Sequence, residues 1–190
     1  MKYNYSWVLL LAVSLIGCKP KVQKIELFDL AKLAEQQQQY FEKSTFSITR
    51  ISILNSISDT LTIDNYLWEE EISSMKSLDL NPTRYKTDYK EENSTAGDQK
   101  LLKYTLDLPK KEFTGIYEFS VYYQDDINHP SKIEILQLAH NLVYKQTNRY
   151  LFQFVNDGKR HYLNEFSLEG SQDLMMKDPV IYQISSKAIN

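Results

Sequence analysis

Apolar residues recur at helical spacing shortly after an N-terminal polar stretch. Leu27, Leu30, Ala31, Ala34 and Phe41 follow the i, i+3, i+4 and i+7 positions that share one face of a helix. The pattern predicts a helix from Glu26 to Glu42. The glutamine run at residues 36–39 is expected on the solvent-facing side of this helix, because glutamine is a good helix former.

From Ser44 to Ile63 the period of the apolar positions changes from helical to two. Two alternating runs are separated by the turn residues of Asn55 to Asp59, which predicts a β-hairpin. A second helix is expected next, capped by Asp64 or Asn65.

The second predicted helix carries three glutamates, residues 69–71, in its first turns, where the helix dipole favours negative charge. Trp68, Ile72 and Met75 share its apolar face. The helix should end before Asn81-Pro82, since the residue before a proline is disfavoured in a helix.

Residues 86–100 are polar and charged, and they are expected to form a loop. After Lys100, short alternating runs follow one another with turn residues between them, which is typical of an antiparallel meander. The expected turns lie at Pro109, Asp125-Asp126, 128–130, 156–158, Gly170 and Asp178-Pro179.

The predicted fold class is therefore α+β. Two helices are expected to pack on one face of a twisted antiparallel β-sheet that runs as a meander. Residues 25–190 are expected to form a single domain, since domains commonly have about 100–200 residues.

The N-terminal 17 residues have a different pattern. Lys2 is followed by an uncharged apolar run from Val8 to Gly17. This run is shorter than the ~20 residues that a membrane-spanning helix needs, and its length suits the apolar region of a signal peptide. Residues 1–17 are therefore predicted to be a signal peptide.

Leu15-Ile16-Gly17-Cys18 resembles the lipobox of bacterial lipoproteins. The resemblance implies cleavage between Gly17 and Cys18, a diacylglycerol on the sulfur of Cys18, and a further acyl chain such as palmitate on the new amine. Residues 18–24 would then be a lipidated tether, and the membrane would be a partner through Cys18. The alternative is an ordinary secretory signal with a cysteine there by chance.

The residues after Cys18 bear on which membrane holds the lipid. Lys19-Pro20-Lys21-Val22 contains no acidic residue. By resemblance to lipoproteins of bacteria with two membranes, an aspartate there would favour the inner membrane, and acidic residues would favour export to the surface in Bacteroidota. The expected location is the periplasmic face of the outer membrane, with the inner membrane and the cell surface left open.

The order of elements resembles that of small lipoproteins of Bacteroidota. The matching residues are Trp68-Glu69-Glu70-Glu71, then Asp79-Leu80-Asn81-Pro82 and Tyr85. The family pattern has a residue between the Asn and the Pro, which this chain lacks. The family has no assigned activity, so the resemblance implies a lipobox and a fold but no chemistry.

Composition excludes several classes of function. The formal net charge of −3 shows no basic excess, so no nucleic-acid partner is expected. The single cysteine excludes an internal disulfide and a cysteine-based zinc site. His129, His140 and His161 lack the spacing of metal ligands and are expected in turns or on the surface. Asp125-Asp126 is expected to stabilise a turn.

No catalytic, metal or cofactor residue is therefore predicted. The expected function is a non-enzymatic binding or assembly module of the cell envelope with a protein partner. The alternative is a carrier or acceptor of a lipid or other apolar ligand, which would require an apolar cavity of about 300 Å³ or more between sheet and helices. An enzyme with a diffuse site is the third hypothesis. The sequence leaves the oligomeric state open.

Overall fold

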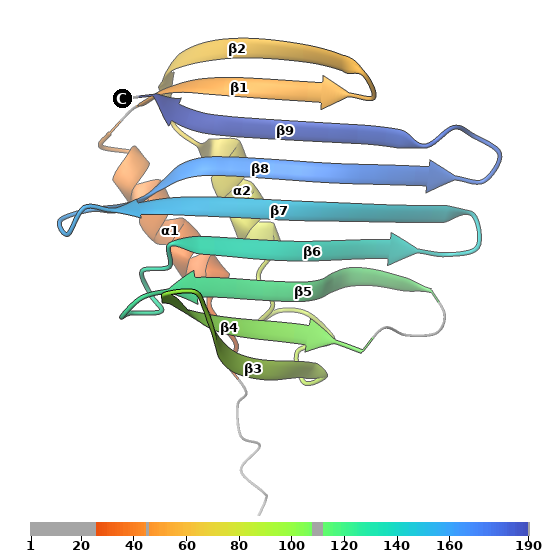
Figure 1. Cartoon of the computed structure of the whole chain (residues 1–190), viewed down its shortest axis with the longest axis horizontal. Coiled ribbons are helices and arrows are strands. Elements are labelled where there is room, and N and C mark those ends of the chain that lie inside the picture. The colour runs from red at the N-terminus through yellow and green to blue at the C-terminus, as the bar shows by residue number, and fades with distance from the viewer. Residues whose placement is uncertain (1–25, 45, 108–111, 190) are drawn as a thin grey trace, which may run out of the picture.

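The computed structural model describes residues 26–44, 46–107 and 112–189. Two helices and one antiparallel sheet of nine strands make up this part of the chain, so the predicted mixture of helix and antiparallel strand is confirmed (Figure 1). The elements are α1 (Leu30–Phe41), β1 (Phe46–Leu54), β2 (Ile57–Tyr66), α2 (Glu69–Ser77), β3 (Tyr89–Ala96), β4 (Gln99–Leu106), β5 (Phe113–Tyr123), β6 (Lys132–His140), β7 (Tyr144–Asn156), β8 (His161–Leu174) and β9 (Val180–Ile189). The expected signal peptide, Gly17, Cys18, the tether and the turn at Pro109 lie outside the described residues.

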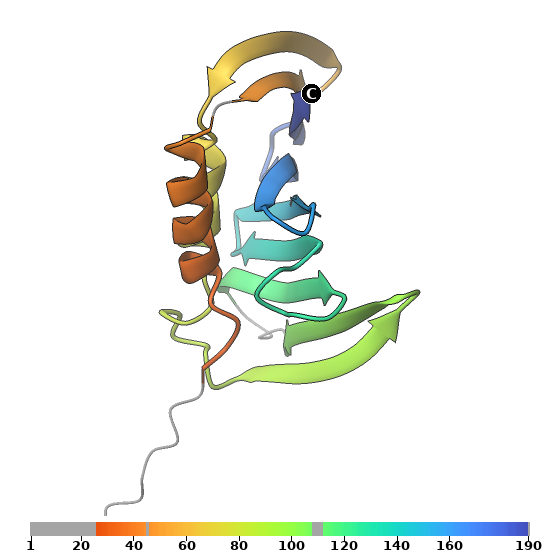
Figure 2. The same ribbon diagram turned by 90° about the vertical axis from the view of Figure 1, so that its left-hand side faces the viewer.

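The strands follow the order β2-β1-β9-β8-β7-β6-β5-β4-β3 across the sheet. Strands β3 to β9 are consecutive neighbours, and the hairpin of β1 and β2 is added beyond β9 through antiparallel pairing of β1 with β9. The segment with α2 therefore carries the chain from one edge of the sheet to the other. Figure 2 shows both helices on the same side of the sheet.

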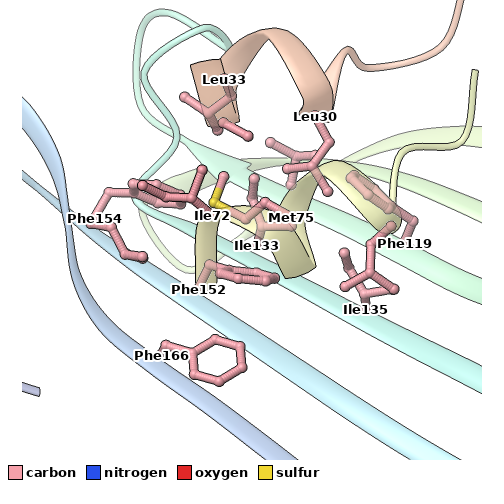
Figure 3. Packing of buried hydrophobic residues seen from close by; sticks show 14 of the residues in the cluster. Leu30, Leu33, Ile72, Met75, Phe119, Ile133, Ile135, Phe152, Phe154 and Phe166 are labelled. Carbon is pink, nitrogen blue, oxygen red and sulfur yellow. The ribbon is translucent and has the colours of Figure 1, made fainter. Parts of the chain in front are cut away.

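Buried side chains of both helices and of the central strands form one apolar cluster (Figure 3). Phe152 of β7 and Ile133 of β6 are fully buried, as are Leu30 of α1 and Met75 of α2. Burial of one such side chain stabilises a fold by about 1.5–3 kcal/mol. The opposite face of the sheet carries ion pairs such as Lys103–Glu118, as expected for an antiparallel sheet with one face in water.

Helix α1 starts four residues later than the predicted Glu26, at Leu30. Asp29 is the N-cap, and its Oδ1 accepts a hydrogen bond from the backbone N–H of Lys32 at 2.8 Å. The expectation that residues 36–39 all face solvent was wrong for Gln37. Its buried side chain accepts a bond from the backbone N–H of Leu163 and donates one to the backbone oxygen of His161.

Helix α2 does not begin at Asp64 or Asn65, because β2 continues to Tyr66. The oxygen of Asp64 instead accepts a bond from the Ser47 hydroxyl across the hairpin at 2.6 Å. The N-cap is Trp68, which has φ +58° and makes no side-chain capping bond. A bulky residue in this conformation is strained, and its complete burial supplies the packing that holds it there.

The loop expected at residues 86–100 was also wrong, because most of it forms β3 and the start of β4. Strand β3 lies at the edge of the sheet, and six of its eight residues are exposed. An exposed edge strand has no buried face to impose an alternation of apolar and polar residues. The charged residues Lys90, Glu91 and Glu92 also protect such an edge against pairing with another chain.

Gly170 was expected in a turn but lies inside β8, where it pairs with Tyr182 of β9. A Cβ atom at this position would lie 2.3 Å from ring atoms of Tyr182. The glycine therefore leaves room for the tyrosine ring to lie across β8.

Candidate functional site

The segment that follows the predicted tether is bonded to the body of the domain. The backbone N–H of Leu27 donates to Oδ1 of Asn81 at 3.1 Å, and that of Leu30 donates to Oδ1 of Asp79 at 3.3 Å. The side-chain amide of Asn81 donates back to the backbone oxygens of Leu27 and Phe28. Asp79 and Asn81 thus satisfy backbone groups at the start of α1 that the helix itself leaves unpaired.

Two further groups strengthen this contact. The hydroxyl of Tyr104 on β4 accepts a bond from the backbone N–H of Phe28 at 3.2 Å, and burial raises the pKa of Tyr104 to about 12. The ammonium of Lys86 donates to Oδ1 of Asn81 at 2.8 Å. The Asp-Leu-Asn-Pro stretch singled out in the sequence therefore has a structural role, which is to fix the first described residues to the domain.

Replacing Asn81 with alanine is expected to lower the free energy of unfolding by about 1–2 kcal/mol, because it leaves backbone groups of residues 27 and 28 without partners. Residues 26–29 should then exchange amide hydrogens faster than in the wild type. The control is Asn93→Ala, since Asn93 is exposed and its side chain donates to Glu91 on the same strand. Equal exchange at residues 26–29 in both variants would contradict this role of Asn81.

The Trp-Glu-Glu-Glu stretch forms a second fixed contact, which we call the Arg50 clamp. The guanidinium of Arg50 on β1 contacts Glu71 at 2.7 Å and Glu70 at 3.0 Å. It also donates to the hydroxyls of Tyr66 and Ser186. The clamp therefore joins the start of α2 to β1, β2 and β9.

Glu71 is the centre of the Arg50 clamp. Its side chain is 2% exposed, whereas that of Glu70 is 77% exposed. The Tyr66 hydroxyl donates to Oε2 of Glu71 at 2.8 Å, and the Ser186 hydroxyl donates to Oε1 at 3.1 Å. Burial first, and the charge of Glu71 second, raise the pKa of Tyr66 far above its usual value, so the hydroxyl remains a donor.

Part of the helix-side face of the sheet extends beyond the helices. In Figure 1 both helices lie behind the left part of the sheet, and β6 to β9 continue to the right of them. Along β7, alternate positions on this face change from Phe154 and Phe152 under the helices to Tyr150, Asn148 and Gln146 beyond them. The residues are therefore phenylalanine where the helices cover the sheet, and tyrosine, asparagine or glutamine where they do not.

Five side chains form a connected polar network on this face, which we call the open floor: Gln137, Gln146, Tyr150 and Tyr182, which are partly exposed, and Asn148, which is 8% exposed. The amide of Asn148 donates to Gln137 at 3.2 Å and to Tyr150 at 3.3 Å. Tyr182 donates to Asn148 and accepts from Gln146. A mostly apolar groove of about 330 Å³ adjoins the open floor and is lined by residues that include Leu54, Ile57 and Ile184.

Two of the three histidines lie together, since the rings of His129 and His161 are 5.2 Å apart, whereas His140 lies at the far end of β6. His129 is exposed and bonds Asp126 at 2.8 Å, and Asp126 also accepts the backbone N–H of Asn128. This confirms the turn-stabilising interpretation of Asp126, whose pKa is lowered mainly by the Asn128 bond. His140 ends β6 beside the ring of Phe113.

His161 departs from the expectation of a turn or surface residue. It begins β8 and is partly buried against the ring of Phe154, with centroids 5.0 Å apart. Its Nε2 lies 2.8 Å from the backbone oxygen of Pro130. Burial, and then the neighbouring His129, lower the pKa of His161 below its usual 6.5, although the Pro130 contact and Asp126 act in the opposite direction.

The lowered pKa of His161 predicts a loss of stability in mild acid. The unfolded chain binds a proton at this residue more readily than the folded chain, so the free energy of unfolding should fall as the pH drops below about 6.5. His161→Gln should remove this part of the pH dependence in chemical denaturation between pH 7.5 and 5. His129→Gln should retain most of it, since His129 is exposed. An unchanged profile in His161→Gln would contradict the assignment.

Sequence reasoning singled out Asp79, Asn81 and the three glutamates but missed Arg50, Gln37 and the open floor. Arg50 gave no signal because it is a single charge in an alternating strand. In β7, the helix-side positions continue the alternation of Phe152 and Phe154 with Tyr150, Asn148 and Gln146. This could have indicated that one face of the strand is apolar at one end and polar at the other. Within the described ranges, no group of three His, Cys, Asp or Glu residues could hold a metal ion, and no helix is long and apolar enough to cross a membrane.

Comparisons with models of known protein families, with curated proteins and with solved structures gave no significant match for this chain.

Proposed function

We propose that this chain is a lipid-anchored module of the bacterial envelope that binds a protein partner without catalysing a reaction. In this proposal residues 1–17 are removed, Cys18 carries the lipid, and the domain stands at the periplasmic face of the outer membrane. The proposed domain has two layers, with the helices packed on one face of the twisted sheet, and the partner binds on the open floor.

The observation that carries the proposal is the docking of residues 27–30 by Asp79 and Asn81. Seven residues separate Cys18 from Glu26, and the eight steps from one Cα atom to the next span at most about 27 Å when extended. A lipid on Cys18 would therefore be joined through a short segment to a point where the chain is firmly bonded. Such an arrangement suits a module that must hold its binding surface close to a membrane.

The open floor supports binding of a protein rather than of a small charged ligand. It offers amide and hydroxyl groups beside an apolar groove, and Leu54 and Ile57 of that groove are exposed. Tyrosine and amide side chains combine apolar contact with adaptable hydrogen bonds, which is common at protein interfaces. The floor residues carry no charge, so shape and hydrogen bonding would determine the choice of partner.

The alternative function, a carrier of a lipid or other apolar ligand, is less well supported, because side chains fill the space between the helices and the sheet. Phe152, Ile133 and Ile135 of the sheet are almost completely buried there, together with Leu30 and Met75 of the helices. A ligand cavity would require these side chains to separate, and interiors packed in this way contain few voids. The hollow between α1 and β4 has a largely polar lining and is open to solvent.

We propose that the protein is not an enzyme because its titratable side chains bond to neighbouring groups of the fold. Asp126 bonds His129 and Asn128 within its own turn, and Asp157 is likewise bonded within its turn. The ring of His161 lies 5.2 Å from that of His129, but its Nε2 is taken up by the backbone oxygen of Pro130. The buried carboxylate of Glu71 is held by Arg50, Tyr66 and Ser186. Such groups stabilise the fold, whereas catalysis would need at least two of them to converge on an open cleft.

Site-specific photo-crosslinking in cells tests the proposal. A photoreactive amino acid at Ile184, beside the open floor, should give a discrete crosslinked protein in the membrane fraction. The matched control is Ser167, which alternates with the buried Phe166 and so lies on the opposite face of the sheet. The crosslink should be lost when Cys18→Ser is added. Equal crosslinking from both positions, or an unchanged crosslink in Cys18→Ser, would contradict the proposal.

A further inference from the structure

Three neighbouring hairpin turns at one end of the sheet carry exposed apolar side chains. We call them the hairpin rim: the β1–β2 turn with Leu54 and Ile57, the β6–β7 turn with Leu142 and Val143, and the β8–β9 turn with Met175 and Met176. The strand order places these turns side by side, at the right in Figure 1. They hold six of the eleven large exposed hydrophobic residues among the described ones.

The most exposed side chains of the rim are at the tips of its turns. Leu142 is 91% exposed and Met176 is 94% exposed. At the other end of the sheet, the turns contain residues such as Asp126, Asn128 and Asp157, which form hydrogen bonds within their turns. The apolar character is therefore specific to one end, and exposed apolar groups gathered in this way mark an interaction surface.

Hydrogen bonds join the three turns into one unit. The backbone N–H of Asn55 donates to the oxygen of Ile181 at 2.7 Å, and the N–H of Ile181 donates to Oδ1 of Asn55 at 3.0 Å. The N–H of Met175 donates to the oxygen of Val143 at 3.0 Å. The rim is thus pre-organised, and ordering it on contact would cost little conformational entropy.

We propose that the β6–β7 and β8–β9 turns of the hairpin rim insert Leu142, Val143, Met175 and Met176 into the surface of a lipid bilayer, while Leu54 and Ile57 remain at the groove beside the open floor. Leu142, Val143, Met175 and Met176 project from the ends of two neighbouring turns. Behind them each lysine has an aspartate beside it, since Lys145 pairs with Asp173 and Lys177 precedes Asp178, so apolar burial rather than charge would drive the insertion. Unbranched, flexible methionine side chains adapt well to an irregular apolar medium.

The position of the anchor fits this orientation, and this step rests on the proposed lipid at Cys18. Phe28 is bonded to Tyr104 of β4, and the strand pairing places Tyr104 level with Tyr150, in the middle of β7 and so half a strand length from the rim. The preceding segment can extend by about 27 Å. Half the length of β7 is about 21 Å. The tether can therefore reach a bilayer that the rim touches, and the lipid and the rim would form two contacts with one surface.

The test uses the chain from residue 18 with Cys18→Ser, so that binding by the rim is measured without the lipid. Because Cys18 is the only cysteine, Leu142→Cys or Met176→Cys can be labelled uniquely with the fluorophore NBD. With vesicles of phosphatidylethanolamine and phosphatidylglycerol, both labels should shift to the blue and be quenched by brominated acyl chains. A label at Asp98→Cys, at the opposite end, should remain in water.

Aspartate substitutions supply the second measurement. Leu142→Asp combined with Met176→Asp should weaken vesicle binding at least about tenfold, because two apolar side chains no longer enter the lipid. The matched control, Leu61→Asp on the edge strand β2, should bind like the parent. Thermal unfolding should be the same for all three, since these side chains are exposed.

The outcomes separate this proposal from the proposed anchor. Labels that stay in water with vesicles overturn the rim proposal even if Cys18 is lipidated. Labels that enter the bilayer support it even if Cys18 carries no lipid. Dimers that dissociate on Leu142→Asp with Met176→Asp, without vesicle binding, would show instead that the rim joins two copies of the chain, and would also overturn the proposal.

Discussion

Replacing Glu71 with alanine is expected to lower the free energy of unfolding by about 3 kcal/mol. The change leaves the mostly buried guanidinium of Arg50 without its closest carboxylate, and removing one partner of a buried ion pair typically costs about 3–5 kcal/mol. The lower end applies because Arg50 is 17% exposed and keeps its contact with Glu70. The Tyr66 and Ser186 hydroxyls also lose their acceptor. Chemical denaturation at pH 7 measures the effect.

The neighbouring Glu70→Ala is the matched control. Glu70 contacts the same guanidinium at 3.0 Å, but it is largely exposed to solvent. Exposed ion pairs contribute only about 0–1 kcal/mol. Comparing the loss of stability in the two variants therefore shows how much of the effect of Glu71 is due to its burial and how much to its ion pair alone. Equal losses for the two variants would show that the Arg50 clamp does not depend on the burial of Glu71.

Phe152→Ala is expected to cost about 3–5 kcal/mol, the largest effect of any single change considered for the sheet. Phe152 is fully buried, packs on Phe166 with ring centroids 5.2 Å apart, and belongs to the same cluster as Met75 of α2. The cavity left behind would lie between the sheet and the helices. Thermal and urea unfolding would both report the loss.

A double-mutant cycle shows whether helix and sheet are packed together at this point. Met75→Ala should cost about 2–5 kcal/mol by itself. Combined with Phe152→Ala, the total loss should differ from the sum by more than about 0.5 kcal/mol, because side chains that share a cavity are coupled. Leu142→Ala, at an exposed position, should be nearly neutral and add independently. Strict additivity of Met75→Ala and Phe152→Ala would contradict a common core.

The strands with a buried face could be predicted from the sequence. Ile133 and Ile135 in β6 flank Glu134, and Phe152 and Phe154 in β7 flank Gln153, because one face of these strands is covered. The same rule explains why β3 was missed, since an edge strand exposed on both faces has no alternation. The alternation of apolar and polar residues shows that one face of a segment is buried. A strand can therefore be predicted from it only where one face of the strand is covered.

The limits of the elements depended on contacts between distant residues. Residues 26–28 fit a helical pattern, but the backbone of Leu27 and Phe28 is bonded by Asn81 and Tyr104, which are more than 50 positions away in the sequence. Gln37 looked like a solvated residue in a polar run, but it bonds the backbone at the start of β8. Such pairings follow from the order of strands in the sheet, which a local pattern does not contain.

The binding surfaces were hidden for a related reason. Tyr182 and Gly170 are adjacent only because β8 pairs with β9 in one register, and the open floor depends on that pairing. The rim residues Leu142 and Met176 are single apolar residues in turns, and each is unremarkable alone. They form a common surface only because the strand order brings three turns to the same end of the sheet.

The most direct test of the central claim is the intact mass of the protein purified from a bacterial membrane fraction, measured beside a Cys18→Ser variant. A lipid-anchored module should have a mass that lacks residues 1–17 and includes acyl chains. The variant should keep residues 1–17 and gain no lipid. An unacylated, soluble product cleaved at another position would contradict the anchor, and the domain would then have to be regarded as a freely secreted binding protein.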